Sequence, residues 1–225
     1  MSLVMLYHSR RFGVVGCDGR ISTKRYKPWS RLKPWERPHL VALPERIARK
    51  FVILRPSPGL VLAGTGSYSA YCDYAVYETV RQHVDVFPNA TFDQIAEIIP
   101  RTVREASAAL QAPRDSHMNL SLMGFDQIQG RVRLRAFTCT PRSHHETDEC
   151  EAGATVTGSL KAEAGEAELF GNRLFELIDG EYSPESVQRA MLSLGAEISA
   201  SRPEVIGPPY SFAIVTQREI ALRSA

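Results

Sequence analysis

The first eighteen residues hold two apolar segments joined by a polar turn, and this arrangement constrains the fold more than any other stretch. The segments 3–7 and 12–17 have the length and composition of strands, and the turn 9–11 separates them. Two such strands form an antiparallel hairpin, which returns Asp18 towards the start of the chain. There Ser2 follows the initiator methionine. A serine at an N-terminus can attack through its hydroxyl while its α-amine, with a pKa near ~8, accepts the proton.

The composition excludes several classes of protein. A length of 225 residues is ample for a buried core, and 44% apolar with 23% charged residues is ordinary globular composition. The net charge of +2 is too small to argue for a nucleic-acid partner by itself. No apolar run approaches the ~20 residues that span a bilayer, and the N-terminus lacks the pattern of a secretory signal. We therefore expect a cytoplasmic protein with no membrane contact.

The cysteines and histidines do not predict a metal site. The four cysteines are far apart in sequence and form no CxxC pair, which is compatible with a reducing compartment. The segment 144–150 contains His, Glu, Asp and Cys, the residue types of a metal site. Adjacent histidines point in different directions, however, and no second cluster completes a tetrahedral set. We predict a solvated loop at 144–150, no metal and no cofactor.

The hydrophobic pattern predicts the order strands, two helices, strands, two helices and a final strand. The expected strands lie within residues 3–17, 51–65, 119–124, 131–138 and 209–216. The expected helices are about 67–83, a helix from Thr91 that Pro100 should kink or break, 165–177, and a helix that begins with Ser183 and Pro184. This order is neither alternating βαβ nor all-β, and by itself it indicates an α+β protein.

Several segments, in their order along the chain, resemble the β subunits of proteasomes and the bacterial peptidase HslV. These are N-terminal nucleophile (Ntn) hydrolases, and the chain is similar to a divergent member of their family. The matching pieces are Ser2 and Asp18 of the opening hairpin, 49–54, 59–67, 119–126 and 209–216. The resemblance implies one Ntn-hydrolase domain over residues 1–225. Its expected fold class is α+β, a four-layer αββα sandwich.

The resemblance also implies a catalytic site and a mechanism of peptide or amide hydrolysis. Ser2 would attack the scissile carbonyl, with its own α-amine as the base. The ammonium of Lys50 would stabilise the charged nucleophile, and Asp18 would orient Lys50. Backbone N–H groups near Gly66 would form the oxyanion hole.

Two of these assignments have neighbours in sequence that the residues alone do not exclude. Arg49 precedes Lys50, and a slip of one residue would place a guanidinium in the site. Gly64 lies two residues before Gly66 and has the same freedom to turn the backbone.

The resemblance further implies a peptide or protein substrate, assembly into a homo-oligomeric ring, and an ATP-dependent unfoldase as partner. The alternative is a catalytically inactive Ntn-fold scaffold or binding subunit, for which proteasome α subunits are the precedent. Departures from the family favour this alternative. The segment 154–160 matches the family's Gly-Ser-Gly-Ser only at Gly158-Ser159, and 202–209 lacks the Asp and Ser that active members carry there.

A basic and aromatic insertion at about 20–40 separates Asp18 from Lys50. Residues 20–39 carry seven Lys or Arg against one acid, interleaved with Tyr26, Trp29 and Trp35. Such a segment can stack on single-stranded nucleic acid or pack its tryptophans against a neighbouring subunit. We favour the subunit arm and do not expect a nucleic-acid partner, because nothing else in the chain supports one.

Overall fold

The computed structural model describes residues 3–21, 24–26, 40–42, 46–47, 50–66, 70–109, 117–149, 153–158, 165–178, 182–201, 203 and 206–225. Most of the basic insertion therefore lies outside the described residues, as do Ser2 and Arg49. The strands are β1 (Leu3–His8), β2 (Phe12–Asp18), β3 (Arg20–Ile21), β4 (Lys24–Tyr26), β5 (Leu40–Ala42), β6 (Arg46–Ile47), β7 (Phe51–Arg55), β8 (Leu60–Gly66), β9 (Met118–Asp126), β10 (Arg131–Cys139), β11 (His144–Glu149), β12 (Gly153–Gly158), β13 (Tyr210–Thr216) and β14 (Ile220–Ser224). The helices are α1 (Ala70–Val86), α2 (Phe92–Ala109), α3 (Glu166–Leu177) and α4 (Pro184–Ser201).

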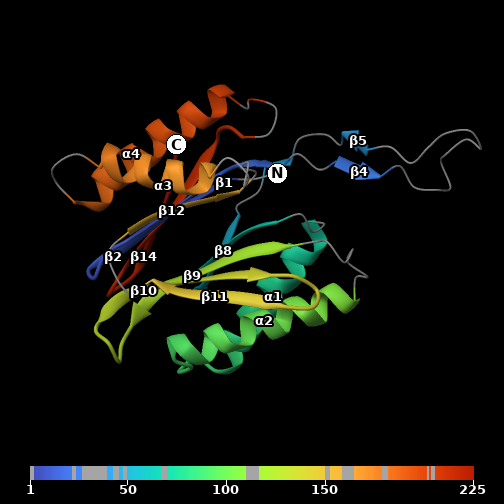
Figure 1. The fold of residues 1–225 in the computed structure, drawn as a ribbon. Coiled ribbons are helices and arrows are strands. Elements are labelled where there is room, and N and C mark those ends of the chain that lie inside the picture. The colour runs from blue at the N-terminus through green and yellow to red at the C-terminus, as the bar shows by residue number, and fades with distance from the viewer. Residues whose placement is uncertain are drawn as a thin grey trace, which may run out of the picture.

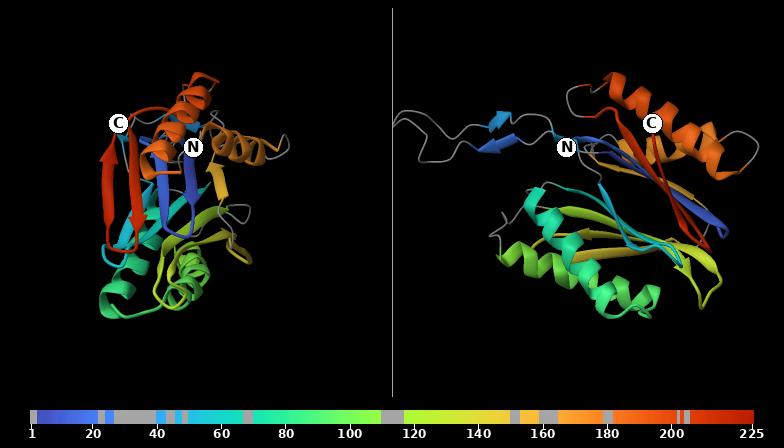
Figure 2. Two further views of the ribbon diagram at one scale, coloured as in Figure 1. Left: turned by 90° about the vertical axis from the view of Figure 1, so that its left-hand side faces the viewer. Right: turned by 180° about the vertical axis from the view of Figure 1, so that it is seen from behind.

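Two antiparallel five-stranded sheets pack face to face and form the centre of the molecule (Figure 1). The first sheet has the order β12-β1-β2-β13-β14, and the second has the order β11-β10-β9-β8-β7. Helices α3 and α4 pack on the outer face of the first sheet, and α1 and α2 pack on the outer face of the second (Figure 2).

Strand β1 shows how the sequence produces this packing. All six of its residues are buried, because one face of the strand meets helices and the other meets the second sheet. Leu3, Met5 and Tyr7 belong to the core beneath α3 and α4, whereas Val4 and Leu6 belong to the core between the sheets. Successive side chains of β1 point to opposite faces, and both faces are buried in an apolar core. The strand is therefore apolar at every position from 3 to 7.

Helices α2, α3 and α4 begin within one residue of the predicted positions, whereas α1 is described from Ala70 and ends at Val86, beyond the predicted end at 83. Thr91 caps α2: its hydroxyl accepts from the N–H of Gln94, and the side chain of Gln94 accepts from the N–H of Thr91. Ser183 and Ser186 form the equivalent pair at the start of α4. The predicted break at Pro100 does not occur, because α2 continues through this buried proline to Ala109. The packing of the apolar face of α2 against β9 and β10 outweighs the single missing N–H.

The predicted four-layer αββα sandwich is corrected by this structure, which is organised as two antiparallel sheets with few helices. Three edge strands, β11, β12 and β14, widen the sheets beyond the strands that the sequence predicts. Among the described residues, one pair of helices accompanies each five-stranded sheet. The helices are therefore additions to the sheets rather than two further layers of equal standing.

The predicted loop at 144–150 is also wrong, because His144–Glu149 forms β11. All six residues are polar and residues 144–148 are exposed, so the strand carries no apolar alternation. It forms because its backbone pairs with β10 along six residues.

Four short strands, within the insertion and just after it, pair two by two as a narrow ribbon. β3 pairs with β6, and β4 pairs with β5, both antiparallel. The described strands β4 and β5 lie beyond the edge of the sheets, near the N-terminal end of β1 (Figure 1). Within the described part of the chain, no helix is long and apolar enough to cross a membrane.

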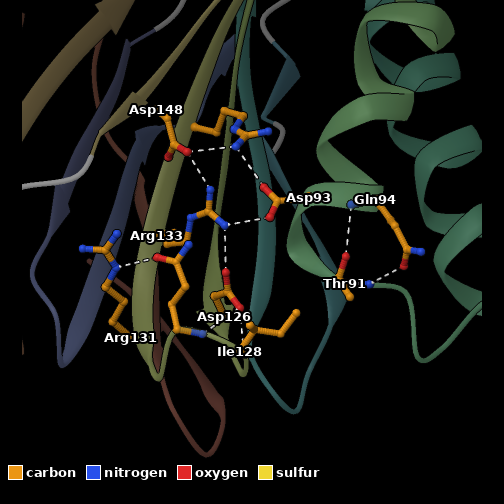
Figure 3. A network of polar contacts seen from close by, with 10 residues as sticks. Thr91, Asp93, Gln94, Asp126, Ile128, Arg131, Arg133 and Asp148 are labelled. Carbon is orange, nitrogen blue, oxygen red and sulfur yellow. Dashed lines mark hydrogen bonds and ion pairs between the residues drawn. The ribbon is translucent and has the colours of Figure 1, made fainter.

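An ionic network fastens α2 to the second sheet (Figure 3). The guanidinium of Arg133 in β10 is 4% exposed and donates to Asp126 at 2.7 Å, to Asp148 at 2.6 Å and to Asp93 at 3.1 Å. It also lies over the ring of Phe92, 4.7 Å from the centroid. Because Asp93 is in the first turn of α2, Arg133 joins that helix to three strands.

Acid should weaken this network. Burial alone would raise the pKa of Asp126 and Asp148, but hydrogen bonds from the arginines outweigh it, so both pKa values are lowered. The unfolded chain then binds more protons, so the stabilisation is present above about pH 4 and is lost as the pH falls through the lowered pKa values. Between about pH 6 and about pH 3.5, we expect the free energy of unfolding in urea to fall more in the wild type than in Arg133→Met.

At about pH 6, Arg133→Met should lose about 3–5 kcal/mol, because Asp126 stays buried without its partner. Arg101→Met is the matched control, since Arg101 is an exposed arginine of α2 outside the network, and it should change stability by less than about 0.5 kcal/mol. An acid dependence that Arg133→Met leaves unchanged would contradict this assignment.

Candidate functional site

The opening hairpin brings its last residue back to its first, as the sequence predicts. Val4 of β1 pairs with Cys17 of β2, so Asp18 lies beside Leu3. The N–H of Leu3 donates to Oδ1 of Asp18 at 2.6 Å. The side chain of Asp18 is fully buried, and this hydrogen bond satisfies part of its need for donors.

Lys50 provides the second donor to the same carboxylate oxygen. It lies directly before β7, in the second sheet, and its ammonium donates to Oδ1 of Asp18. Lys50 is 7% exposed, so both members of the pair are withdrawn from water. The structure thus brings Lys50 and Asp18 together across the two sheets, 32 residues apart in sequence.

Burial shifts the proton affinity of both members of this pair. Burial raises the pKa of Asp18, although the Lys50 ammonium and the backbone N–H groups of Leu3 and Gly207 oppose it. Burial lowers the pKa of Lys50, although the Asp18 carboxylate opposes it. Burial thus opposes the charged form of both groups, whereas the contact between the ammonium and the carboxylate favours it.

Backbone and side-chain contacts fix the position of Lys50. Its carbonyl accepts from the N–H of Gly64 at 3.0 Å and from the hydroxyl of Tyr77 at 3.2 Å. A Cβ at Gly64 would lie 2.7 Å from that hydroxyl and 2.6 Å from Cδ2 of Leu120. Gly64 therefore has a packing role, since only glycine leaves room for Tyr77 to reach Lys50.

Gly66 is the last residue of β8 and pairs with Met118 of β9. The residue before it, Thr65, is buried, and its hydroxyl lies 3.3 Å from the hydroxyl of Thr157 in β12. Thr157 pairs with Val4, and its neighbour Gly158 pairs with Leu3. The end of β8 thus lies against the strand that borders the start of β1.

Cys17 also borders the charge pair. Burial raises the pKa of its thiol to about 11, against hydrogen bonds with the backbone of Lys50 and of Ser211. A thiol of this kind is protonated at neutral pH and behaves as a small apolar side chain.

The predicted site residues fall into two groups. Asp18, Lys50 and Gly66 lie in the described part of the chain at one end of the sheets, whereas Ser2 lies outside it. Tyr77 and Thr157 adjoin these residues, and no local pattern in the sequence marks either of them. Within the described residues, no group of three or more His, Cys, Asp or Glu could hold a metal ion.

Comparisons with known proteins support a relationship of fold. No protein-family model matches the chain, and no curated protein matches its sequence. Among solved structures, it is similar to a Gly-1 mutant of Anbu from Hyphomicrobium sp. strain MC1, with a TM-score of 0.68 and 15% sequence identity. The similarity covers 100% of this chain and 87% of that chain. Anbu is a proteasome-like protein with an Ntn fold.

The resemblance to proteasome β subunits and HslV as a family is therefore corrected. With no family model matching, the short segments that carry the resemblance do not establish membership. A likeness at 15% identity shows a shared fold with a proteasome-like protein, and that fold alone.

Replacing Asp18 should lower the free energy of unfolding, because it leaves one charge of the buried pair without its partner. Asp18→Asn keeps an oxygen for the N–H of Leu3 but leaves the ammonium of Lys50 buried without a countercharge. We expect a loss of about 3–5 kcal/mol in the free energy of unfolding at neutral pH, measured in urea. Because Lys50 then has a lowered pKa in the folded state alone, this loss should shrink as the pH rises towards about 9.5.

The double variant Asp18→Asn/Lys50→Met is the control, since it removes both charges. It should recover most of the stability that Asp18→Asn loses, because no charge is left buried. Equal losses in the single and double variants would show that the pair is not an ionic one.

Proposed function

We propose that this chain is an N-terminal nucleophile hydrolase that cleaves amide bonds in peptide or protein substrates, with Ser2 as the nucleophile. The observation that carries the proposal is the buried Lys50–Asp18 pair beside the N–H of Leu3. The Leu3 nitrogen, whose N–H donates to Asp18, forms the peptide bond with the carbonyl carbon of Ser2. Cleavage of the bond before Ser2 would leave its hydroxyl and a free α-amine next to the pair.

In this mechanism the α-amine takes the proton of the Ser2 hydroxyl as the oxygen attacks the substrate carbonyl. The ammonium of Lys50 stabilises the negative charge that develops on the attacking oxygen, and Asp18 holds that ammonium in place. Backbone N–H groups at Gly66 donate to the oxyanion of the tetrahedral intermediate. The leaving amine departs with the proton, and water then hydrolyses the Ser2 ester.

The energetics of the pair support a functional role in addition to its structural one. Two buried charges cost several kcal/mol of desolvation each, by general estimate, and apolar side chains of similar volume stabilise a core as well or better. The chain nevertheless places Lys50 and Asp18 within an otherwise apolar region and holds Lys50 through Gly64 and Tyr77. A pair retained in this way is suited to activating a group beside it.

We further propose that copies of the chain assemble into a ring. The shared fold with a proteasome-like protein supports this part of the proposal, and the ribbon at the insertion offers a contact arm. Light scattering after size exclusion gives the number of subunits.

Covalent labelling tests the proposed nucleophile. After incubation with an epoxyketone or β-lactone inhibitor, intact mass spectrometry should show loss of Met1 and one adduct, which peptide mapping places on Ser2. Ser2→Ala should lose Met1 equally, because alanine is also small, but should form no adduct. Ser2→Thr should restore labelling, because threonine keeps the hydroxyl.

Two controls separate labelling from side reactions. Ser224→Ala, at an exposed serine in β14, should label like the wild type. Lys50→Met should lower the labelling rate by about 10²–10³-fold, the typical effect of removing one electrostatic stabiliser. Retained Met1, or a free Ser2 that never labels, would contradict the proposal and favour the inactive scaffold.

A further inference from the structure

A hydrogen bond between two threonines connects the sheets next to the residues proposed for catalysis. Thr65 precedes Gly66 at the end of β8, and Thr157 lies in β12 beside the residue that pairs with Leu3. Their hydroxyl oxygens are 3.3 Å apart, and either can donate. The two residues are 92 positions apart in sequence, so the bond joins two distant parts of the chain.

Apart from this bond, the Lys50–Asp18 pair and the hydrogen bond from the N–H of Val132 to the carbonyl of Arg10, the described contact between the sheets is largely apolar. Side chains such as Val15, Val61 and Met123 fill it. Apolar contact is non-directional, so it holds the sheets together without fixing how far one is shifted along the other. A hydrogen bond requires a defined distance and angle, and it can therefore set that shift at the end where it lies.

The proposed mechanism needs the two sheets held at a fixed shift, because its groups come from both of them. The Lys50–Asp18 pair fixes the position of Lys50, and the threonine bond fixes the end of β8 that carries Gly66. Asp18 and the start of β1 belong to the first sheet, whereas Gly66 and Lys50 belong to the second or adjoin it. A misplacement of about 1 Å between reacting groups can cost on the order of 10²-fold in rate.

We propose that Thr65 and Thr157 are positioning residues, which hold the end of β8 at a fixed distance from the start of β1. They act through Gly66 and Leu3 and do not contact the substrate. Their catalytic consequence rests on the proposed function, but their effect on Leu3 does not.

Hydrogen exchange, followed by NMR, tests the positioning without any activity. The Leu3 amide is protected by its bond to Asp18, so its exchange reports on the local contact. Thr157→Val removes the hydroxyl and keeps the shape, and it should speed exchange at Leu3 by about tenfold. Thr157→Ser should restore the wild-type rate, whereas the amide of Phe212 in β13 should be unaffected in both variants.

Thr138→Val is the matched control. Thr138 donates to Asn119 at 3.0 Å within the second sheet, so its loss removes a hydrogen bond without uncoupling the two sheets. Exchange at Leu3 should stay at the wild-type rate. Unchanged exchange at Leu3 in Thr157→Val, or an equal increase at Leu3 and Phe212, would overturn the positioning role.

The labelling rate of Ser2 measures the catalytic consequence. Thr157→Val should lower the maximal labelling rate by up to about tenfold, with the half-saturating inhibitor concentration unchanged. A wild type that never labels would refute the hydrolase proposal, while the exchange at Leu3 would still decide the role of the threonines. A wild type that labels, beside a Thr157→Val variant that labels equally fast, would refute the catalytic consequence alone.

Discussion

The buried contact between Lys50 and Asp18 is the interaction on which the arrangement of the two sheets depends. Asp18 ends β2 in one sheet and Lys50 precedes β7 in the other, so the ion pair forms only when both sheets are paired in the correct register. A slip of one residue moves a side chain by about 3.3 Å along its strand and turns it to the opposite face. Such a slip in either hairpin would leave one charge in an apolar core. The pair therefore destabilises the wrong registers more than it stabilises the correct one. An interaction with a high desolvation cost can specify a fold in this way.

The sequence predicts the parts of the fold that are paired and buried on both faces. Apolar runs such as 3–7 and 12–17 read as strands because their alternate residues enter two different cores. The edge strands β11 and β12 are not predicted, since β11 is polar throughout and β12 is built of small residues and threonine. They form strands because their backbones pair with the neighbouring strands β10 and β1, and the pattern of their own side chains does not predict this pairing. The same limit applies to Pro100. Its low helix propensity predicts a break, but the packing of α2 keeps the helix continuous through it.

Some contacts of the candidate site can be predicted from spacing along the chain, and others cannot. The spacing of the hairpin places Asp18 beside Leu3, and this could be read directly from the chain. That Lys50 meets Asp18 was expected only through a resemblance, and the structure supplies the contact itself. The supports of the site, Tyr77 from α1 and Thr157 from β12, come from elements that no spacing connects to Asp18. Residues of this second kind are visible only after the chain has folded.

The polar edge strand β11 has a consequence for how the molecule behaves at high concentration. An exposed sheet edge offers a row of backbone donors and acceptors to any passing strand, and this is a common route to aggregation. β11 ends the second sheet with two histidines, a threonine and three acids, and residues 144–148 of this strand are exposed. Two such edges brought together would set carboxylates against carboxylates, and the repulsion would oppose their pairing. The same lack of apolar residues that makes β11 hard to predict from sequence thus also opposes pairing between two copies of this edge.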